Sequence, residues 1–142
     1  ARGQDFNREQ MLPFELIRAK VLRLAGQGIQ AVGFLEPLIK AHPDDASVIH
    51  QYAESLFSVG DEQSLTLAAH HYDRLIQGLA PPPAPPNIWW NAWMRRLQIN
   101  DRLEHDTDVI TTRVRQLETT DANLGGPRYR DEFERLAQKH AR

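Results

Sequence analysis

The chain has 142 residues, no cysteine and a formal net charge of -2. It is long enough to bury about two-thirds of its unfolded surface, and without cysteine it has no disulfide, no thiolate nucleophile and no sulfur-ligated zinc. The nearly neutral charge lacks the basic footprint of a nucleic-acid-binding domain, so we expect no nucleic acid as a partner.

No apolar run approaches the roughly 20 residues that a helix needs to cross a bilayer. No charged-then-apolar signal peptide opens the sequence either. We therefore expect a soluble protein without membrane insertion, and the sequence does not indicate its compartment.

The first predicted element is a helix that begins near Pro13. Residues 1–11 are mostly polar and are predicted to be an N-terminal tail, either a linker or the frayed end of an upstream helix, so the folded domain is placed at 12–142. Proline suits the first turn of a helix, where its missing N–H costs nothing. The following apolar residues recur at helical spacing, as Phe14, Ile17, Val21 and Leu24.

A second helix is predicted from 29 to 41, with Ala31 where two helices would have to come close. Its interior Pro37 removes a hydrogen bond, so we expect a bend or an irregular start. Pro43 and the two aspartates after it mark a stop and a new cap. Further helices are predicted at about 46–59 and from 62 to about 79.

These helices share a repeat. Three residues recur 34 positions later: Ala19, Leu22 and Gly26 return as Ala53, Leu56 and Gly60. Four others recur 37 positions later: Ala31, Leu35, Leu38 and Ile39 return as Ala68, Tyr72, Leu75 and Ile76. The constant difference indicates an insertion of three residues near 61–67.

The proline-rich segment at 81–86 is predicted to be a stiff extended connector. Its P-x-x-P pattern also matches an SH3 or WW ligand, although a proline stop between helices explains it equally well. The helical pattern then returns at offsets of 41 and 42, as Trp90, Trp93, Met94 and Leu97 and as Ile110, Val114 and Leu117. This predicts a fifth helix after the prolines and a sixth at about 107–119.

A last helix is predicted from Pro127. Tyr129, Phe133 and Leu136 form one apolar stripe, and the opposite face is charged, with Asp131 and Arg135 spaced to pair. A terminal helix with a single apolar side is typical of a capping element.

The repeat resembles the tetratricopeptide repeat (TPR) family, a 34-residue unit of two helices. The resemblance covers 12–80 well and 87–121 loosely, because Met94 and Ile110 replace small residues in the third unit. It implies an all-α fold, an α-solenoid of hairpins at about 12–45, 46–80 and 87–121 with a capping helix at 127–141. Adjacent hairpins would stack, since one hairpin cannot cover its own apolar face.

The resemblance also implies a concave groove, lined by the first helix of each hairpin, that binds a peptide or protein. The groove residues carried over are Ile17, Lys20 and Arg23, then His50, Gln51 and Glu54, then Asn91, Arg95 and Gln98. Trp89 is added as a partly exposed interface residue, since tryptophan is a favoured anchor. Trp90 and Trp93 are assigned to the core.

No motif indicates catalysis or a cofactor. The neighbouring His70 and His71 would point about 100° apart on a helix, which is unsuitable for one metal ion, so we expect solvent-facing or capping histidines and no metal. Glycine-rich phosphate loops, nucleophile elbows and metal-ligand spacings are missing from the sequence. We therefore expect no enzyme.

The sequence thus predicts a non-catalytic protein–protein interaction module, a scaffold or adaptor with an unidentified partner. One alternative is a structural or oligomerisation domain whose groove is filled by its own chain or by a second copy. A third class, RNA binding through a basic strip of Arg95, Arg96, Lys20 and Arg23, predicts salt-sensitive affinity. A solvated charged face explains that strip equally well.

Overall fold

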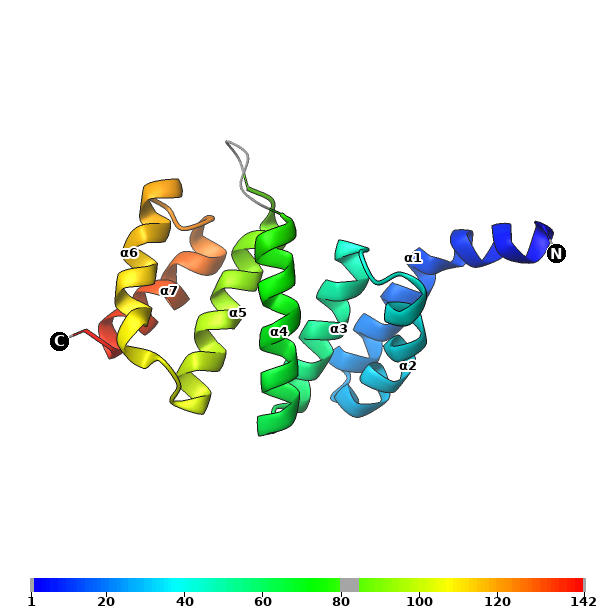
Figure 1. The fold of residues 1–142 in the computed structure, drawn as a ribbon, viewed down its shortest axis with the longest axis horizontal. Coiled ribbons are helices and arrows are strands. Elements are labelled where there is room, and N and C mark those ends of the chain that lie inside the picture. The colour runs from blue at the N-terminus through cyan, green and yellow to red at the C-terminus, as the bar shows by residue number, and fades with distance from the viewer. Residues whose placement is uncertain (1, 80–84, 142) are drawn as a thin grey trace. The chain divides into compact units, whose positions relative to one another are not determined.

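The computed structural model describes the backbone of residues 2–79 and 85–141, and the side chains of 11–79 and 85–141. Within these ranges every regular element is a helix (Figure 1). The elements are α1 (Arg2–Leu24), α2 (Gly28–Ala41), α3 (Ala46–Val59), α4 (Glu62–Gly78), α5 (Asn87–Leu103), the 3-10 helix η1 (Thr107–Val109), α6 (Ile110–Thr120) and α7 (Pro127–Lys139). The predicted all-α class is confirmed.

Most helix positions agree with the sequence analysis, but the start of α1 does not. The helix begins at Arg2, so the segment predicted as a tail is helical from there and Pro13 lies in the helix interior. The prediction that Pro13 opens the helix is wrong. A proline removes one hydrogen bond of the ladder, and in a helix of 23 residues the other hydrogen bonds continue on either side.

The three residues inserted in the second repeat lengthen a helix. The start of α4 at Glu62 lies 34 positions after the start of α2 at Gly28, but α4 has 17 residues and α2 has 14. Most of the predicted connector at 81–86 falls outside the described residues, and Pro86 directly precedes α5.

Local sequence accounts for the helix ends. Asp45 caps α3 by accepting hydrogen bonds from the backbone N–H groups of Ser47 and Val48 at 2.9 and 3.2 Å. Gly26 after α1 and Gly60 after α3 have φ values of 80° and 82°. This left-handed conformation favours glycine, which explains why the repeat has a glycine at this position.

The chain divides into two compact units, Ala1–Ala68 and Ala69–Arg142, and the division falls within α4. In the first unit α1, α2 and α3 all contact one another. The small repeat residues Ala19, Ala31 and Ala53 are completely buried. A methyl group at these positions lets helix backbones approach closely, as the repeat pattern predicted.

In the second unit α7 packs against both α5 and α6. Its predicted stripe of Tyr129, Phe133 and Leu136 is buried in a core that also includes Trp90 and Leu124. The predicted pairing of Asp131 with Arg135 is not formed. Arg135 instead donates to Glu132, with Nε 2.7 Å from Oε1 of the carboxylate.

Candidate functional site

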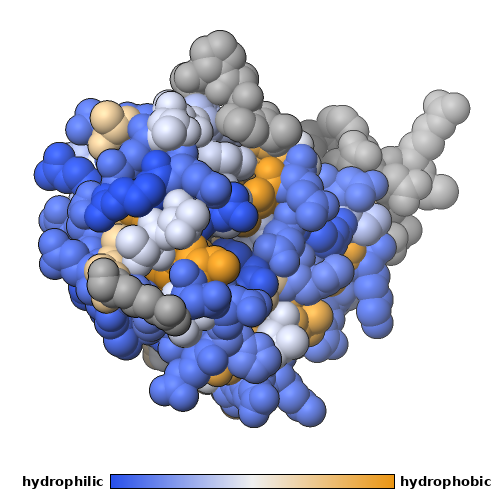
Figure 2. Space-filling model, turned by 60° about the vertical axis from the view of Figure 1, so that its left-hand side comes forward, coloured by the Kyte–Doolittle hydropathy of each residue, from blue (hydrophilic) through white to orange (hydrophobic). Residues whose placement is uncertain are grey.

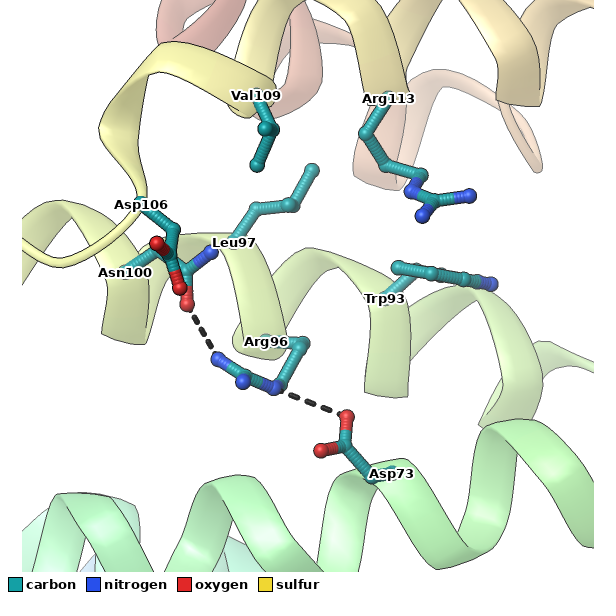
Figure 3. Close-up of a pocket in the computed structure, with 8 residues that line it drawn as sticks. All are labelled: Asp73, Trp93, Arg96, Leu97, Asn100, Asp106, Val109 and Arg113. Atoms are coloured by element: carbon teal, nitrogen blue, oxygen red, sulfur yellow. Dashed lines mark hydrogen bonds and ion pairs between the residues drawn. The ribbon is translucent and has the colours of Figure 1, made fainter.

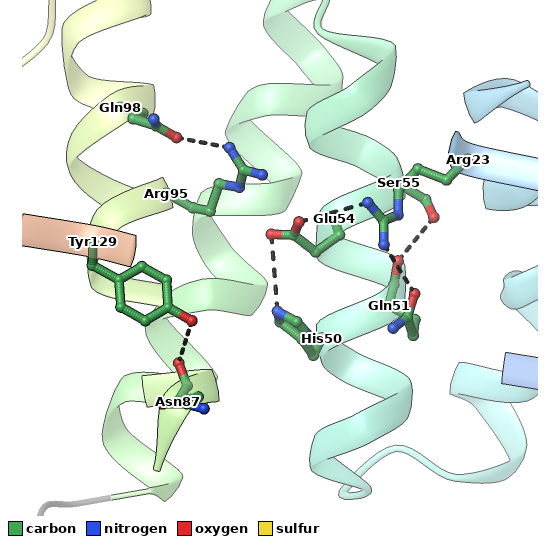
Figure 4. Close-up of polar contacts among 9 residues, drawn as sticks. All are labelled: Arg23, His50, Gln51, Glu54, Ser55, Asn87, Arg95, Gln98 and Tyr129. Carbon is green, nitrogen blue, oxygen red and sulfur yellow. Dashed lines mark hydrogen bonds and ion pairs between the residues drawn. The ribbon is translucent and has the colours of Figure 1, made fainter. Parts of the chain in front are cut away.

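Four of the predicted groove residues meet in the first unit, on α1 and α3 (Figure 4). Glu54 is only 6% exposed, with Arg23 Nη1 3.8 Å and His50 Nε2 3.9 Å from its carboxylate oxygens. Arg23 Nη2 also donates to Gln51 Oε1 at 3.5 Å. A buried carboxylate needs such compensation, since burying an unpaired charge is costly. The cluster therefore links α1 to α3.

The remaining groove residues of this unit, Ile17 and Lys20, are exposed. Ile17 belongs to a row of large apolar side chains along one side of α1, which we call the α1 stripe. Its members are more than half exposed: Met11 54%, Phe14 70%, Ile17 59%, Val21 60% and Leu24 69%. The spacing that predicted the helix thus belongs to its exposed side, while Ala19 is buried on the opposite side.

Exposed apolar side chains are otherwise scattered. On the face shown in Figure 2, hydrophilic residues cover most of the surface and hydrophobic residues appear in small separate areas. Outside the α1 stripe, the exposed large hydrophobic side chains within the described residues are Ile29, Leu67 and Val109. Isolated residues of this kind are normal on protein surfaces, whereas a contiguous row is unusual.

In the second unit the tryptophans differ from the prediction. Trp89, expected to be partly exposed, is 4% exposed, so this prediction is wrong. Its ring makes edge-to-face contacts with Trp90 and Trp93, at centroid distances of 4.9 and 6.3 Å, which covers it. Trp93 is the partly exposed one, with the Arg113 guanidinium 4.7 Å from its ring centre. Trp89 is therefore a core residue and not a surface anchor.

The three predicted groove residues of α5 differ in burial. Asn91 is buried, at 7% exposed. Arg95 and Gln98 are half-buried, and Nη1 of the arginine donates a hydrogen bond to Oε1 of the glutamine at 2.9 Å (Figure 4). The guanidinium groups of Arg23, Arg95 and Arg96 thus each contact a side chain of the protein itself.

A pocket that the sequence analysis did not identify lies within the second unit (Figure 3). It has a volume of about 330 Å³ and is lined by side chains from α4, α5, α6 and the segment joining the last two: Asp73, Trp93, Arg96, Leu97, Asn100, Asp106, Val109 and Arg113. Arg96 Nε donates to Asp73 Oδ1 at 2.9 Å, and its Nη1 donates to Asn100. The pocket combines opposite charges with an apolar wall.

No local motif could have revealed this pocket, because its residues lie between positions 73 and 113 on different elements. Of its lining residues, the sequence pattern singles out Trp93 and Leu97 as repeat positions and Arg96 as part of a basic strip. In Figure 3 Asp106 and Arg113 lie at different ends, with Leu97 and Val109 between them. A ligand that fits this lining would carry polar groups at both ends and an apolar middle.

The adjacent histidines also differ from the prediction. His70 is exposed, but His71 is 9% exposed, so it does not face solvent. Burial, with the nearby His70 and Arg74, lowers the pKa of His71 to about 4. His71 is therefore neutral at pH 7. Within the described residues, no three His, Asp or Glu side chains are grouped closely enough to hold a metal ion.

No protein-family model, curated protein or solved structure matches the chain. None of the helices in the described part is both long enough and apolar enough to span a bilayer.

Proposed function

We propose that this protein is a non-catalytic protein-interaction module of TPR-like hairpins arranged as an α-solenoid, with α1 as a contact element. The 34-residue repeat supports the proposed architecture. Its small residues are buried where helices cross, and its glycines end α1 and α3 in the same conformation. A repeat of this kind stacks its units side by side and leaves extended surfaces for partners.

The α1 stripe is the observation that carries the proposal. A helix with apolar residues on all sides is normally buried. On its inner side α1 has Ala19, completely buried, and on its outer side five large apolar side chains face water. Leaving such a row exposed forgoes the favourable free energy of apolar burial, about 25 cal/mol per Å². Contact with another polypeptide would recover it.

Site-specific photo-crosslinking tests this proposal. A benzophenone amino acid replaces Phe14 on the α1 stripe or, as the control, the exposed Gln138 on α7. Irradiation of the intact chain in extracts of its source cells should give a covalent adduct with a polypeptide from position 14 and none from position 138. No adduct from either position, or the same adducts from both, would contradict the proposal.

A second candidate, an oligomerisation domain, is favoured by the spacing of the α1 stripe. Phe14, Ile17, Val21 and Leu24 follow intervals of three, four and three, the spacing of a two-helix coiled-coil seam. Sedimentation velocity separates the two candidates. Dimers that persist on dilution and disappear in Ile17→Asp would support self-association, and a monomer at all concentrations would reject it.

A further inference from the structure

We propose that the α1 stripe binds an amphipathic α-helix of a partner protein, one that carries acidic residues beside its own apolar stripe. This inference rests on the proposed function, since it names the chemistry of the partner at the same surface. It follows from three observations: how α3 is covered, how the α1 stripe is spaced, and which charges lie beside it.

The repeat shows what covers the equivalent side of α3. Ser58 and Tyr52 lie 34 positions after Leu24 and Arg18. A β-carbon at Gly28 of α2 would lie 3.2 Å from Ser58 Oγ, so α2 passes directly over this end of α3. The pKa of Tyr52 is raised by burial and by the Glu36 carboxylate of α2. Both residues therefore lie on the side of α3 that faces α2, where Tyr52 is buried and Ser58, near the start of α2, remains exposed.

Two further residues on this side of α3 are buried. Val48 and Ser55, 34 positions after Phe14 and Val21, are completely buried. They lie between Tyr52 and Ser58 on the same side of the helix at 3.6 residues per turn. The side of α3 that corresponds to the α1 stripe is thus covered by helices: α2 approaches Ser58 and Tyr52, and Gln51, the counterpart of Ile17, accepts a hydrogen bond from Arg23 of α1. The same geometry on α1 calls for a helix in the place that α2 has on α3.

The dimensions of the α1 stripe suit a helix. Phe14 and Val21 are seven positions apart, as are Ile17 and Leu24. This period keeps one side of a helix facing a second helix. The stretch from Met11 to Leu24 spans about 20 Å at 1.5 Å per residue. A partner helix of about four turns would cover it.

The basic residues beside the α1 stripe indicate that the partner helix carries acidic residues. By helical geometry Arg18 lies at one edge of the α1 stripe and Lys20 at the other, and both are exposed. The Arg18 guanidinium lies 5.3 Å from the ring centre of Phe34, which keeps it beside α1. Glu15, the only carboxylate between Met11 and Leu24, lies beyond Arg18 and is half-buried, whereas the two cations are exposed. Acidic flanks on the partner would complement these two cations.

The same charges disfavour a second copy of the chain. In a paired coiled coil, flanking residues of one helix face flanking residues of the other, and their charges determine partner choice. Arg18 and Lys20 are the flanks of the α1 stripe and no carboxylate lies at a flanking position between Met11 and Leu24, so a second copy offers these cations no acidic partner in either orientation. Like charges across an interface oppose association. We therefore assign the stripe to a helix with acidic flanks and not to a second copy of the chain.

The test uses two fluorescein-labelled synthetic helices of about three heptads each, with leucine at the seam positions and either glutamate or lysine at the flanks. Fluorescence anisotropy measures their binding to the intact chain. We expect the glutamate helix to bind about tenfold or more tightly than the lysine helix, with affinity that falls as salt rises. Ile17→Asp should abolish binding. The matched control, Leu67→Asp, changes an exposed apolar residue on α4 and should leave it unchanged.

A charge reversal isolates the electrostatic part of the proposal. The double variant Arg18→Glu with Lys20→Glu should prefer the lysine helix. Both residues are exposed, so we expect the charge-reversed variant to fold. It therefore still tests the proposal if Ile17→Asp loses its helical circular dichroism. Equal binding of the two helices, unchanged by the reversal, would overturn the acidic partner and leave the proposed function intact.

Other outcomes would also overturn the inference. One is binding to phosphatidylserine vesicles, lost in Ile17→Asp, with no binding to either helix, since it would assign the stripe to a membrane surface. Another is a dimer that Ile17→Asp dissociates, since it would assign the stripe to a second copy. Failure of both helices alone rejects the partner chemistry. The same failure together with no adduct from position 14 rejects the proposed function as well.

Discussion

Gly125 lies in the connection between α6 and α7, with a φ of 85°. A β-carbon there would lie 2.5 Å from Cγ of the Trp90 ring, far inside contact distance. Gly126 has a φ of 109° but open space where its β-carbon would be. The two neighbours therefore separate backbone strain from side-chain collision.

We predict that Gly125→Ala lowers the free energy of unfolding by about 2–4 kcal/mol, because it adds a collision with a buried ring to the backbone strain. Gly126→Ala should cost only about 1 kcal/mol, since it introduces strain alone. Urea denaturation of both variants measures the difference. Equal losses would show that Trp90 moves away without cost.

His71 predicts a pH dependence of stability. Its pKa is lowered to about 4 in the folded protein, against about 6.5 in the unfolded chain. Between these values the unfolded chain binds the extra proton, so the contribution of His71 is present above about pH 6.5 and is lost as the pH falls toward 4. We expect a loss of about 1–2 kcal/mol, less than the full shift implies because the ring keeps some contact with water.

The variant His71→Gln should remove this part of the pH dependence in denaturation measured at pH 7 and pH 4.5. His70→Gln is the matched control, because His70 is the exposed neighbour on the same helix and its removal leaves most of the effect. An unchanged pH dependence in His71→Gln would mean that the ring is protonated in the folded state.

At the scale of elements, the end of α7 is held to α5 by a single carboxylate. Lys139 Nζ and His140 Nε2 each lie 2.8 Å from Asp101 Oδ1. Burial opposes ionisation of Asp101, but hydrogen bonds from these two residues outweigh it and lower its pKa. The contribution is therefore present at pH 7 and is lost as the pH falls below the unfolded-state pKa of about 4.

We predict that Asp101→Asn lowers stability by about 1–2 kcal/mol at pH 7, because two charged hydrogen bonds are weakened. Amide hydrogen exchange should accelerate most in the last turns of α7. Asp108→Asn, at an exposed carboxylate of η1, is the control and should change stability by less than about 0.5 kcal/mol. Uniform acceleration across the second unit would mean that Asp101 does not act on α7 locally.

The elements also show what the sequence could predict. The bounds of α3 and the stripe of α7 follow from local signals, a capping aspartate and residues at helical spacing, and these predictions were correct. The start of α1 was predicted wrongly because a proline opens some helices and is tolerated within others, so the position of Pro13 alone does not distinguish the two. The exposure of Trp89 was predicted wrongly because its burial depends on how three aromatic rings pack, which helical spacing does not determine.

The candidate site was predicted only in part. The resemblance implied that Arg23, His50, Gln51 and Glu54 line a groove, and the structure brings these four side chains together. It did not predict that they would compensate one another, because the exposure of a carboxylate depends on tertiary packing. The pocket and the exposure of the α1 stripe have no local signature, since both depend on which helices lie alongside.

At the scale of the whole molecule, two compact units each bury their own core, and α1 alone displays a continuous apolar row among the described residues. Burying that row would release water from large apolar side chains and would place Arg18 and Lys20 beside the bound chain. Both effects would favour association through α1 over association through the isolated exposed residues Ile29, Leu67 and Val109.

Amide NMR spectra of the intact chain, recorded during titration with the glutamate-flanked helix, test this central claim most directly. The account predicts chemical-shift changes that cluster between Met11 and Leu24 and that vanish in Ile17→Asp. Changes that cluster at the α5–α6 pocket or on α7, or no changes at any concentration, would contradict it.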